Sequence, residues 1–193
     1  THDKREAAKA LYKQLRSQSW AALAPQLPAY DAASPRERLD RVSLLRAVAV
    51  VVSESDTHEG EAEARAWLIR QLDDPDEKIR RYAMAALAKL DGTPETESAL
   101  KSRIGSAKSE RETRQLRESL TRAGSAATLE SLSHNPAPDR EAEQRLQARL
   151  ARSRSRSGIR MALAIQPTPT FESASAAAAS DVGSTSFGAI GAA

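Results

Sequence analysis

The residue types that most often carry chemistry in proteins are few in this sequence and do not gather into a site. The three histidines, His2, His58 and His134, follow no metal-ligand spacing, and no histidine stands four residues after His58 to complete a helical zinc-protease motif. Residues 183–188 have the glycine spacing of a phosphate loop, but Ala189 occupies the position of the essential lysine. Cysteine is absent, and no serine lies in a Gly-x-Ser-x-Gly motif. The sequence therefore predicts no catalytic, cofactor or metal site, and a protein that is not an enzyme.

Positive charge is the remaining chemical feature, and it is unevenly distributed. The formal net charge of the 193-residue chain is +3, but residues 101–160 contain 14 lysines and arginines against 7 acids. Helical spacing places Arg114 with Arg117 on one face, and likewise Arg145, Arg149 and Arg152. One interpretation is a solvated face, because acids are interleaved with these arginines: Glu110, Glu112, Glu118, Glu141 and Glu143. The other is RNA or another polyanion bound through residues 101–160 by phosphate contacts, although aromatic residues for base stacking are scarce.

A list of candidate partner-binding residues follows from these faces and from the preceding helices. Arg80 and Arg81 have two interpretations. One is pairing with acids at the start of their own or the adjacent helix, for which Asp74, Asp76 and Glu77 are near enough in the sequence, and the other is recognition of an acidic ligand. Trp67 is expected in the core or lining a groove, and would become a contact anchor if it were exposed. The candidates are Trp67, Arg80, Arg81, Arg111, Arg114, Arg117, Arg145, Arg149 and Arg152.

The segment 67–92 predicts the helical hairpin that must position part of this set. Asp74 is expected to cap the second helix, with Pro75 at its first position and Gly92 stopping it in the left-handed conformation. An apolar stripe at helical spacing predicts the buried face of that helix: Ile79, Tyr82, Ala83, Ala86, Leu87 and Leu90. A hairpin of this size needs neighbours on both sides to bury its apolar surface.

Similar signals for helix starts and ends predict further helices along the chain. The apolar stretch that follows the cap signal Ser34-Pro35 is interpreted as a helix, although its valine-rich end is also compatible with a strand. Thr93-Pro94 is expected to start a helix that carries Ile104 and stops at Gly105, and Ser109-Glu110-Arg111-Glu112 is expected to form a capping box that opens the next helix. Several positions recur after 33 residues, a period typical of stacked helical pairs. The expected helices are 3–18, 20–27, 37–53, 61–72, 77–90, 93–105, 109–123, 126–132 and 139–152, of which 37–53, 77–90, 109–123 and 139–152 would form the inner layer.

The hairpin resembles a known repeat. An Asp-Pro turn, an apolar residue followed by arginine, then Ala-x-x-Ala-Leu and a closing glycine are typical of HEAT-like repeats of the phycobilisome-lyase type, and residues 74–92 show this pattern. The resemblance covers about 25 residues around 67–92. It implies an all-α, armadillo-like fold, a short α-solenoid of stacked antiparallel helix pairs. It also implies one possible activity, that of a bilin lyase acting on phycobiliproteins.

The C-terminal part differs in composition from the rest. Ile159, Met161, Leu163 and Ile165 alternate with other residues, which indicates a short strand, and the following residues are rich in Ala, Ser and Gly. Such a tail buries too little apolar surface to offset its ordering entropy and is predicted to be disordered. The expected organisation is a helical repeat domain at 1–157, then the short possible strand and low-complexity tail at 158–193.

These features favour a non-catalytic scaffold or adaptor that binds another protein. The alternatives are an accessory RNA- or polyanion-binding domain of a larger nucleic-acid-modifying enzyme, for example a methyltransferase, and the bilin-lyase activity that the resemblance implies. The charged N-terminus lacks the apolar core of a signal peptide, and no apolar run is long enough to span a bilayer. We therefore expect no membrane association and an intracellular, cytoplasmic location.

Overall fold

The computed structural model describes residues 2–31, 37–90, 92–137 and 139–164, and every regular element in these ranges is helical. The chain divides into two compact units, Thr1–Ser153 and Arg154–Ala193. The helices are α1 (His2–Arg16), α2 (Trp20–Leu23), the 3₁₀ helix η1 (Ala24–Gln26), α3 (Leu27–Asp31), α4 (Arg38–Ser53), α5 (Glu61–Gln71), α6 (Glu77–Lys89), α7 (Pro94–Lys101), α8 (Glu110–Ala123), α9 (Ala126–Ser133) and α10 (Arg140–Ala164). The all-helical prediction is confirmed for these residues.

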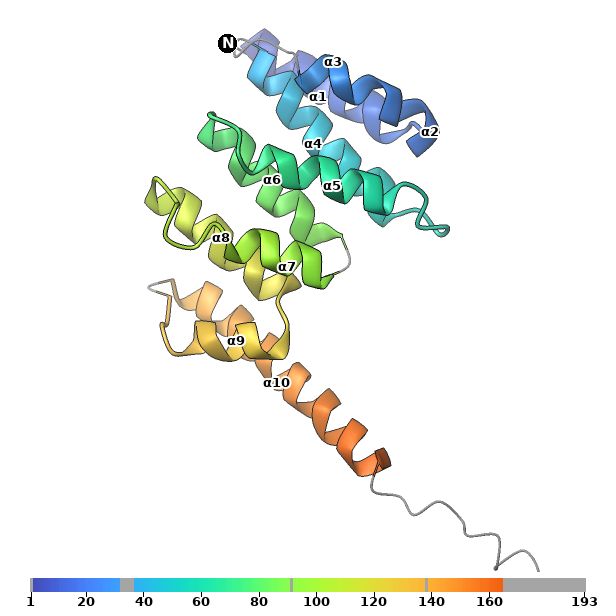
Figure 1. The fold of residues 1–193 in the computed structure, drawn as a ribbon. Helices are drawn as coiled ribbons and strands as arrows, with labels where there is room; N and C mark the ends of the chain where they lie inside the picture. Colours follow the sequence, from blue (N-terminus) through green and yellow to red (C-terminus); the bar gives the residue numbers. More distant parts are fainter. Residues whose placement is uncertain (1, 32–36, 91, 138, 165–193) are drawn as a thin grey trace, which may run out of the picture. The chain divides into compact units, whose positions relative to one another are not determined.

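Within the first unit the helices form two layers (Figure 1). Helices α1, α4, α6 and α8 pack side by side in chain order and make the most extensive contacts. Helices α5 and α7 lie on the other side and contact each other as well as the first layer, and α9 packs on α8. The expected inner helices 37–53, 77–90 and 109–123 thus correspond to α4, α6 and α8, which lie next to one another.

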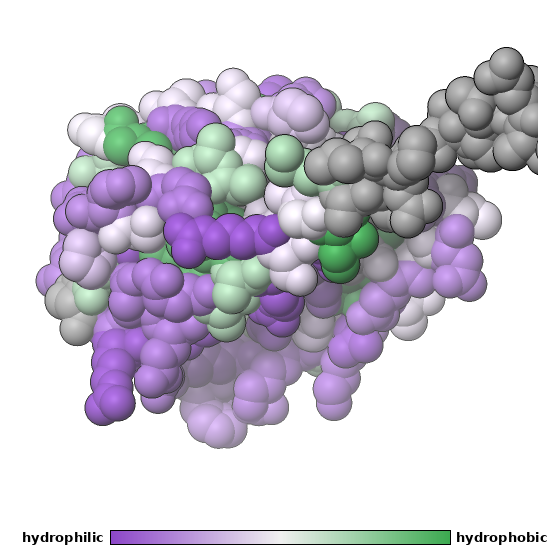
Figure 2. Space-filling view, turned by 90° about the horizontal axis from the view of Figure 1, so that it is seen from below, coloured by the Kyte–Doolittle hydropathy of each residue, from purple (hydrophilic) through white to green (hydrophobic). Residues whose placement is uncertain are grey.

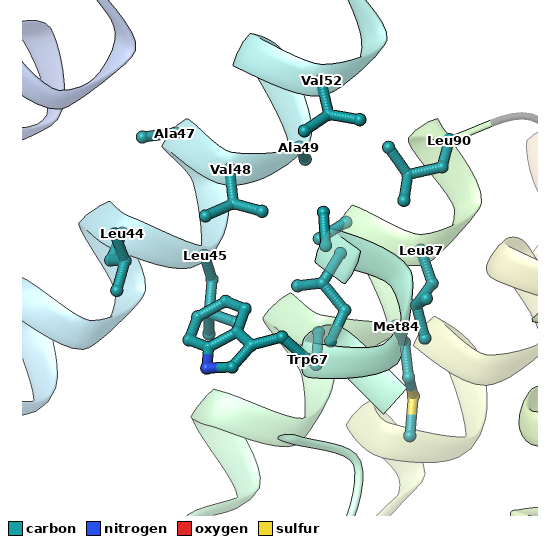
Figure 3. Packing of buried hydrophobic residues seen from close by; sticks show 14 of the residues in the cluster. Leu44, Leu45, Ala47, Val48, Ala49, Val52, Trp67, Met84, Leu87 and Leu90 are labelled. Carbon is teal, nitrogen blue, oxygen red and sulfur yellow. The ribbon is translucent and has the colours of Figure 1, made fainter. Parts of the chain in front are cut away.

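The core lies between these layers and is built mainly by α4, α5 and α6. Figure 3 shows the buried side chains of α4 and α6 gathered in one cluster with Trp67 of α5. Ile79, Ala83 and Leu87 are each 0% exposed, and Leu90 is 4% exposed. The apolar stripe predicted for the second helix of the hairpin is therefore the buried face of α6, although Tyr82 of the same stripe is only half-buried. A smaller cluster joins Leu129 of α9 to residues of α10.

The cap predicted at Asp74 is wrong by two residues. Asp76 is the N-cap of α6, and its carboxylate accepts the Lys78 backbone N–H at 2.8 Å. The Asp74 carboxylate accepts the Asp76 N–H at 2.8 Å and also pairs with Arg41 of α4, so Asp74 shapes the turn and Pro75 precedes the helix. By contrast, the caps predicted at Thr93 and Ser109 are confirmed, since each hydroxyl accepts a backbone N–H three residues on.

Gly92 follows α6 for a reason other than the one the sequence suggested. Among the described residues the glycines with positive φ are Gly60 and Gly105, so Gly92 is not in the left-handed region. A Cβ atom at Gly92 would lie 2.8 Å from the Ala123 carbonyl oxygen, closer than real Cβ contacts. Glycine is therefore required here because the chain passes close to the end of α8.

Three further expectations differ from the structure or fall outside it. The predicted strand is wrong, because Ile159 and Met161 belong to α10, where good helix formers continue a preceding helix and no partner strand is described. Helix α7 ends at Lys101, which leaves Ile104 60% exposed beyond it. The cap signal Ser34-Pro35, Ile165 and the predicted disordered tail lie outside the described residues.

Candidate binding groove

A groove runs along the face formed by α4, α6, α8 and the first part of α10, within the first unit. It consists of three hollows of about 270, 640 and 400 Å³ that share lining residues. Arg122 lines both the first and the second hollow, and Arg145 lines both the second and the third. Because neighbouring hollows share lining side chains on the same face, we treat them as one feature and call it the basic groove.

The lining residues recur at the same positions of successive helices. Four of them stand eight residues after the first residue of their helix: Arg46, Ala85, Glu118 and Ala148. Another four stand twelve residues after it: Val50, Lys89, Arg122 and Arg152. Positions four apart lie on one side of a helix, so the same side of each helix faces the groove. The surface drawn in Figure 2 is largely hydrophilic, with hydrophobic residues in small separate areas.

The groove is more positive than the chain as a whole. Three acids line it, Glu110, Glu118 and Asp139, against ten basic residues, which gives a formal balance of +7 compared with +3 for the entire sequence. The basic residues are Arg46, Arg81, Lys89, Arg111, Arg114, Arg117, Arg122, Arg145, Arg149 and Arg152. Low-dielectric walls around charges of one sign concentrate the field, so this surface favours anionic groups.

At one end of the groove four of the five lining cations are paired with acids, and the fifth, Arg111, is in no ion pair with a described residue. Arg114 is 2.7 Å from Glu110, and Arg145 is 3.2 Å from Glu118. Arg81 is 3.2 Å from Glu77, a pair within α6. Arg117 is 3.2 Å from Glu143. At this end the arginines thus resemble the solvated, mixed-charge face that the interleaved acids suggested.

At the other end the cations lack carboxylate partners. In the described part of the chain no ion pair involves Arg46, Lys89, Arg122, Arg149 or Arg152. The Arg46 guanidinium stacks on the Tyr12 ring at 4.3 Å, and Arg149 donates to the Arg122 carbonyl oxygen at 3.2 Å. Except for the half-buried Arg149, these side chains belong to exposed residues.

A favourable interaction with a helix C-terminus explains the position of only two of these five cations. Lys89 and Arg122 lie in the last turns of α6 and α8, where a cation interacts favourably with the helix by about 0.3–1 kcal/mol. Arg46 lies in the middle of α4, and Arg149 and Arg152 lie well before the end of α10. These three cations therefore have no such local stabilisation.

Two of the predicted partner-binding residues are not on the surface. Trp67 is 3% exposed, and its indole N–H donates to the two Asp31 carboxylate oxygens at 3.0 and 3.1 Å. Arg80 is 2% exposed and belongs to the junction between α6 and α8. Both residues were selected for their chemical type, but packing against the neighbouring helices removes them from contact with a partner. Arg81, Arg111, Arg114, Arg117, Arg145, Arg149 and Arg152 all line the groove.

Arg80 has the structural, ion-paired role of the first interpretation, but its partner is Glu112 at the start of the adjacent helix rather than one of the acids close to it in the sequence. Its guanidinium donates to both carboxylate oxygens of Glu112 at 2.6 and 3.0 Å, and to the carbonyl oxygens of Asp74 and Pro75 at 2.8 and 3.0 Å. Glu112 was expected on a solvated face but is 0% exposed, and it also accepts the Lys108 backbone N–H at 2.9 Å. The hydrogen bonds from Arg80 hold the pKa of Glu112 below its ordinary value, although desolvation opposes this shift.

The same kind of junction recurs along the layer. Arg41 of α4 pairs with Asp74 before α6, Arg80 with Glu112, and Arg117 of α8 with Glu143 of α10. In each case the acid also accepts a backbone N–H from the turn before or at the start of its own helix. Each pair therefore fixes the beginning of one helix of the face against the preceding helix, and so positions the groove.

The groove contains basic residues that are not among the candidates predicted from the sequence, namely Arg46, Lys89 and Arg122. A signal for them was present, because Arg122 follows Lys89 by 33 residues, the repeat period already noted in the sequence. Arg46 was visible as the charged residue within an apolar stretch. What the sequence did not reveal is that these residues meet along one face, since that depends on how the helices stack.

The described residues contain no group of three or more His, Cys, Asp or Glu side chains arranged to hold a metal ion. Across these same ranges, no helix combines the length and apolar character needed to cross a membrane. No protein-family model, curated protein or solved structure matches the chain. The fold and the groove together define a protein whose described residues form a helical domain with a positively charged groove along one layer.

Proposed function

We propose that this chain is a non-catalytic protein-interaction module, a HEAT-like α-solenoid whose basic groove receives a partner. The observation that carries the proposal is the recurrence of groove-lining residues at the same positions of successive helices. Stacked helical repeats offer such a surface because packing fixes the inner helices while their outward positions are free to contact a ligand. A module of this kind acts as a scaffold or adaptor.

Two features support a repeat arrangement of HEAT type. The inner-layer helices α4, α6 and α8 pack in chain order, with α5 and α7 as their partners in the second layer. An arginine–acid pair recurs at each junction between successive inner helices. Packing in chain order is what a quasi-one-dimensional array with nearest-neighbour contacts requires, and a recurring junction contact is compatible with it.

RNA or another polyanion is the second candidate ligand, and the groove's formal balance of +7 favours it. In that case the chain would be an accessory domain of a nucleic-acid-modifying enzyme. The bilin-lyase alternative depends on the sequence resemblance alone. A titration with free bilin tests it, since binding would shift the absorbance of the chromophore.

Site-directed photo-crosslinking tests the leading proposal. A photoreactive amino acid is introduced at Ala148 in the groove or, as a matched control, at the exposed Ala66 on α5, and the full chain is irradiated in native extract. We expect discrete protein adducts from position 148 that are absent at position 66. Adducts that form only at position 66 or only through the C-terminal tail would contradict the proposal. Adducts that consist of RNA at position 148 would favour the second candidate.

A further inference from the structure

We infer that the occupant of the basic groove is an acidic segment of a partner protein, bound in extended conformation across α6, α8 and α10. The inference rests on the proposed function and adds the chemical class of the partner and the residues that recognise it. Its recognition residues are Lys89, Arg122, Arg149 and Arg152, with Arg46 at the far end of the groove.

Charge complementarity is the first argument. Among the described residues these five cations have no ion pair. The one acid that lines the two hollows that share Arg122 is Glu118, which is already paired with Arg145 at 3.2 Å. An excess of unpaired cations in one groove favours a ligand that supplies several anionic groups at once. Guanidinium groups bind carboxylates through parallel hydrogen bonds, which suits glutamate and aspartate side chains.

The shape of the groove is the second argument. Alanines are among the residues that line it, including Ala49, Ala85, Ala88 and Ala148. Because alanine projects only a methyl group, the backbone of a ligand can approach the helices at these positions, within reach of the longer basic side chains. An extended peptide has the required narrow cross-section.

The spacing of the cations limits the spacing of the acids. Lys89, Arg122 and Arg152 occupy the same position on three successive helices. Axes of packed helices are about 8–10 Å apart. An extended chain of the polyproline II type rises about 3.1 Å per residue and completes a turn in three residues, so every third side chain points to the same side and consecutive cations match acids at about every third residue.

The aromatic residues of the groove argue against single-stranded RNA. Binding of unstacked bases usually needs exposed rings, each contributing about 1–3 kcal/mol per base. The Tyr12 ring is covered by the Arg46 guanidinium at 4.3 Å, and Tyr82 is half-buried. Both tryptophans are buried, at 6% and 3% exposed. The groove therefore offers charge without the stacking surface that bases require.

Fluorescence anisotropy with defined probes tests the inference on the full chain. The probes are a labelled peptide of Ala, Ser and Gly with glutamate at every third position, a peptide of the same composition with its glutamates clustered at one end, and single-stranded oligouridine. We compare wild type with the variant Arg122→Gln/Arg149→Gln/Arg152→Gln. The matched control is Arg70→Gln/Lys108→Gln/Arg140→Gln, which removes three exposed cations that do not line the groove.

We expect the spaced peptide to bind wild type most tightly and the groove variant to bind it at least about tenfold more weakly, because three charge contacts are lost. The control variant should stay within about twofold, and wild-type binding should weaken between about 50 mM and about 200 mM salt, as expected for charge pairs that salt screens. Equal weakening by both variants would overturn the inference, because it would indicate general charge attraction. Tighter binding of oligouridine that is lost in the groove variant would also overturn it, in favour of RNA.

The outcome can be separated from that of the proposed function. If none of the probes binds while position 148 still forms protein adducts in extract, the acidic-segment inference is wrong and the interaction module stands. If position 148 forms no adducts, the proposed function fails, whatever the peptides do. Circular dichroism of all three proteins establishes that the variants keep the helical fold.

Discussion

The buried pair Arg80–Glu112 gives a sharp test of how the inner helices are joined. The side chains are 3% and 1% exposed, and the guanidinium also donates to the carbonyl oxygens of Asp74 and Pro75. Replacement Arg80→Met leaves the Glu112 carboxylate buried without its cation. We expect this variant to lose about 3–5 kcal/mol of unfolding free energy, the usual cost of breaking one side of a buried ion pair.

Two further variants show which interactions account for the loss of unfolding free energy in Arg80→Met. Arg80→Lys keeps the charge but has no planar fork, so it loses either the carboxylate or the carbonyl contacts and should cost about 1–2 kcal/mol. The double variant Arg80→Met/Glu112→Leu removes both charges and should be more stable than Arg80→Met, because no buried charge is left unpaired. Urea unfolding followed by circular dichroism measures all three values, and the coupling between the two sites follows from the double-mutant cycle.

The pKa of Glu112 predicts how the effect of Arg80→Met on the unfolding free energy depends on pH. In wild type the pKa of Glu112 is lowered from its ordinary value of 4.5, chiefly by the hydrogen bonds from Arg80. The stabilisation it contributes is therefore fully present above about pH 4.5 and is lost as the pH falls through the folded-state pKa. In Arg80→Met, burial without a cation raises that pKa instead. The stability gap between variant and wild type should then narrow as the pH is lowered from about 7 to about 4.

The result that would refute this reasoning is a small, pH-independent effect. If Arg80→Met cost less than about 1 kcal/mol of unfolding free energy, the pair would behave like an exposed ion pair, and the junction between α6 and α8 would be accessible to water. A double variant less stable than Arg80→Met would also contradict the account. In that case the contacts of Glu112 with its own turn, rather than the ion pair, would hold the helices together.

Three further predictions concern other parts of the first unit and one control in α10. Glu97 accepts hydrogen bonds from the start of α9 and from its own helix, and these lower its pKa to about 2 although desolvation opposes the shift. Glu97→Gln should lower the urea midpoint at about pH 7. The difference in midpoint from wild type should diminish as the pH falls from about 4.5 towards 2. Gly92→Ala should cost about 1–3 kcal/mol because the new Cβ meets the Ala123 carbonyl oxygen at 2.8 Å. The control Gly158→Ala, with nothing within 4 Å, should increase helicity; a neutral Gly92→Ala would contradict the close approach. Trp67→Phe removes the indole donor to α3 and should cost about 1–2 kcal/mol in thermal or urea unfolding, whereas full tolerance would indicate that Trp67 lies in water.

Local sequence signals were sufficient to predict most of the helices. Thr93 and Ser109 cap their helices as predicted, because a cap depends on a side chain and a backbone N–H only three residues apart. The buried stripe of α6 was also predictable, since helical periodicity reports which side of a helix is apolar. The strand expected near Ile159 was wrong because a period of two over seven residues is too short to outweigh the continuation of a helix.

Errors at particular residues trace to contacts that are distant in the sequence. Asp74 looked like a cap, yet Arg41, 33 residues earlier, and the turn itself use its carboxylate. Gly92 looked like a left-handed stop, but the carbonyl oxygen it must accommodate belongs to Ala123. No local pattern contains these partners. The sequence therefore indicated that Asp74 and Gly92 are important positions, but not which contacts require an aspartate and a glycine there.

By itself the sequence determined that this protein is helical, which sides of its helices are apolar, and that positive charge accumulates after residue 100. Only the tertiary structure decided which charges remain available to a ligand. Packing buried Arg80 against Glu112, and stacking brought Arg46, Lys89 and Arg122 to one groove with the arginines of α10. The physical reason is that the periodicity of a helix fixes the direction of each side chain around its own axis, whereas burial and pairing depend on which helices lie beside it.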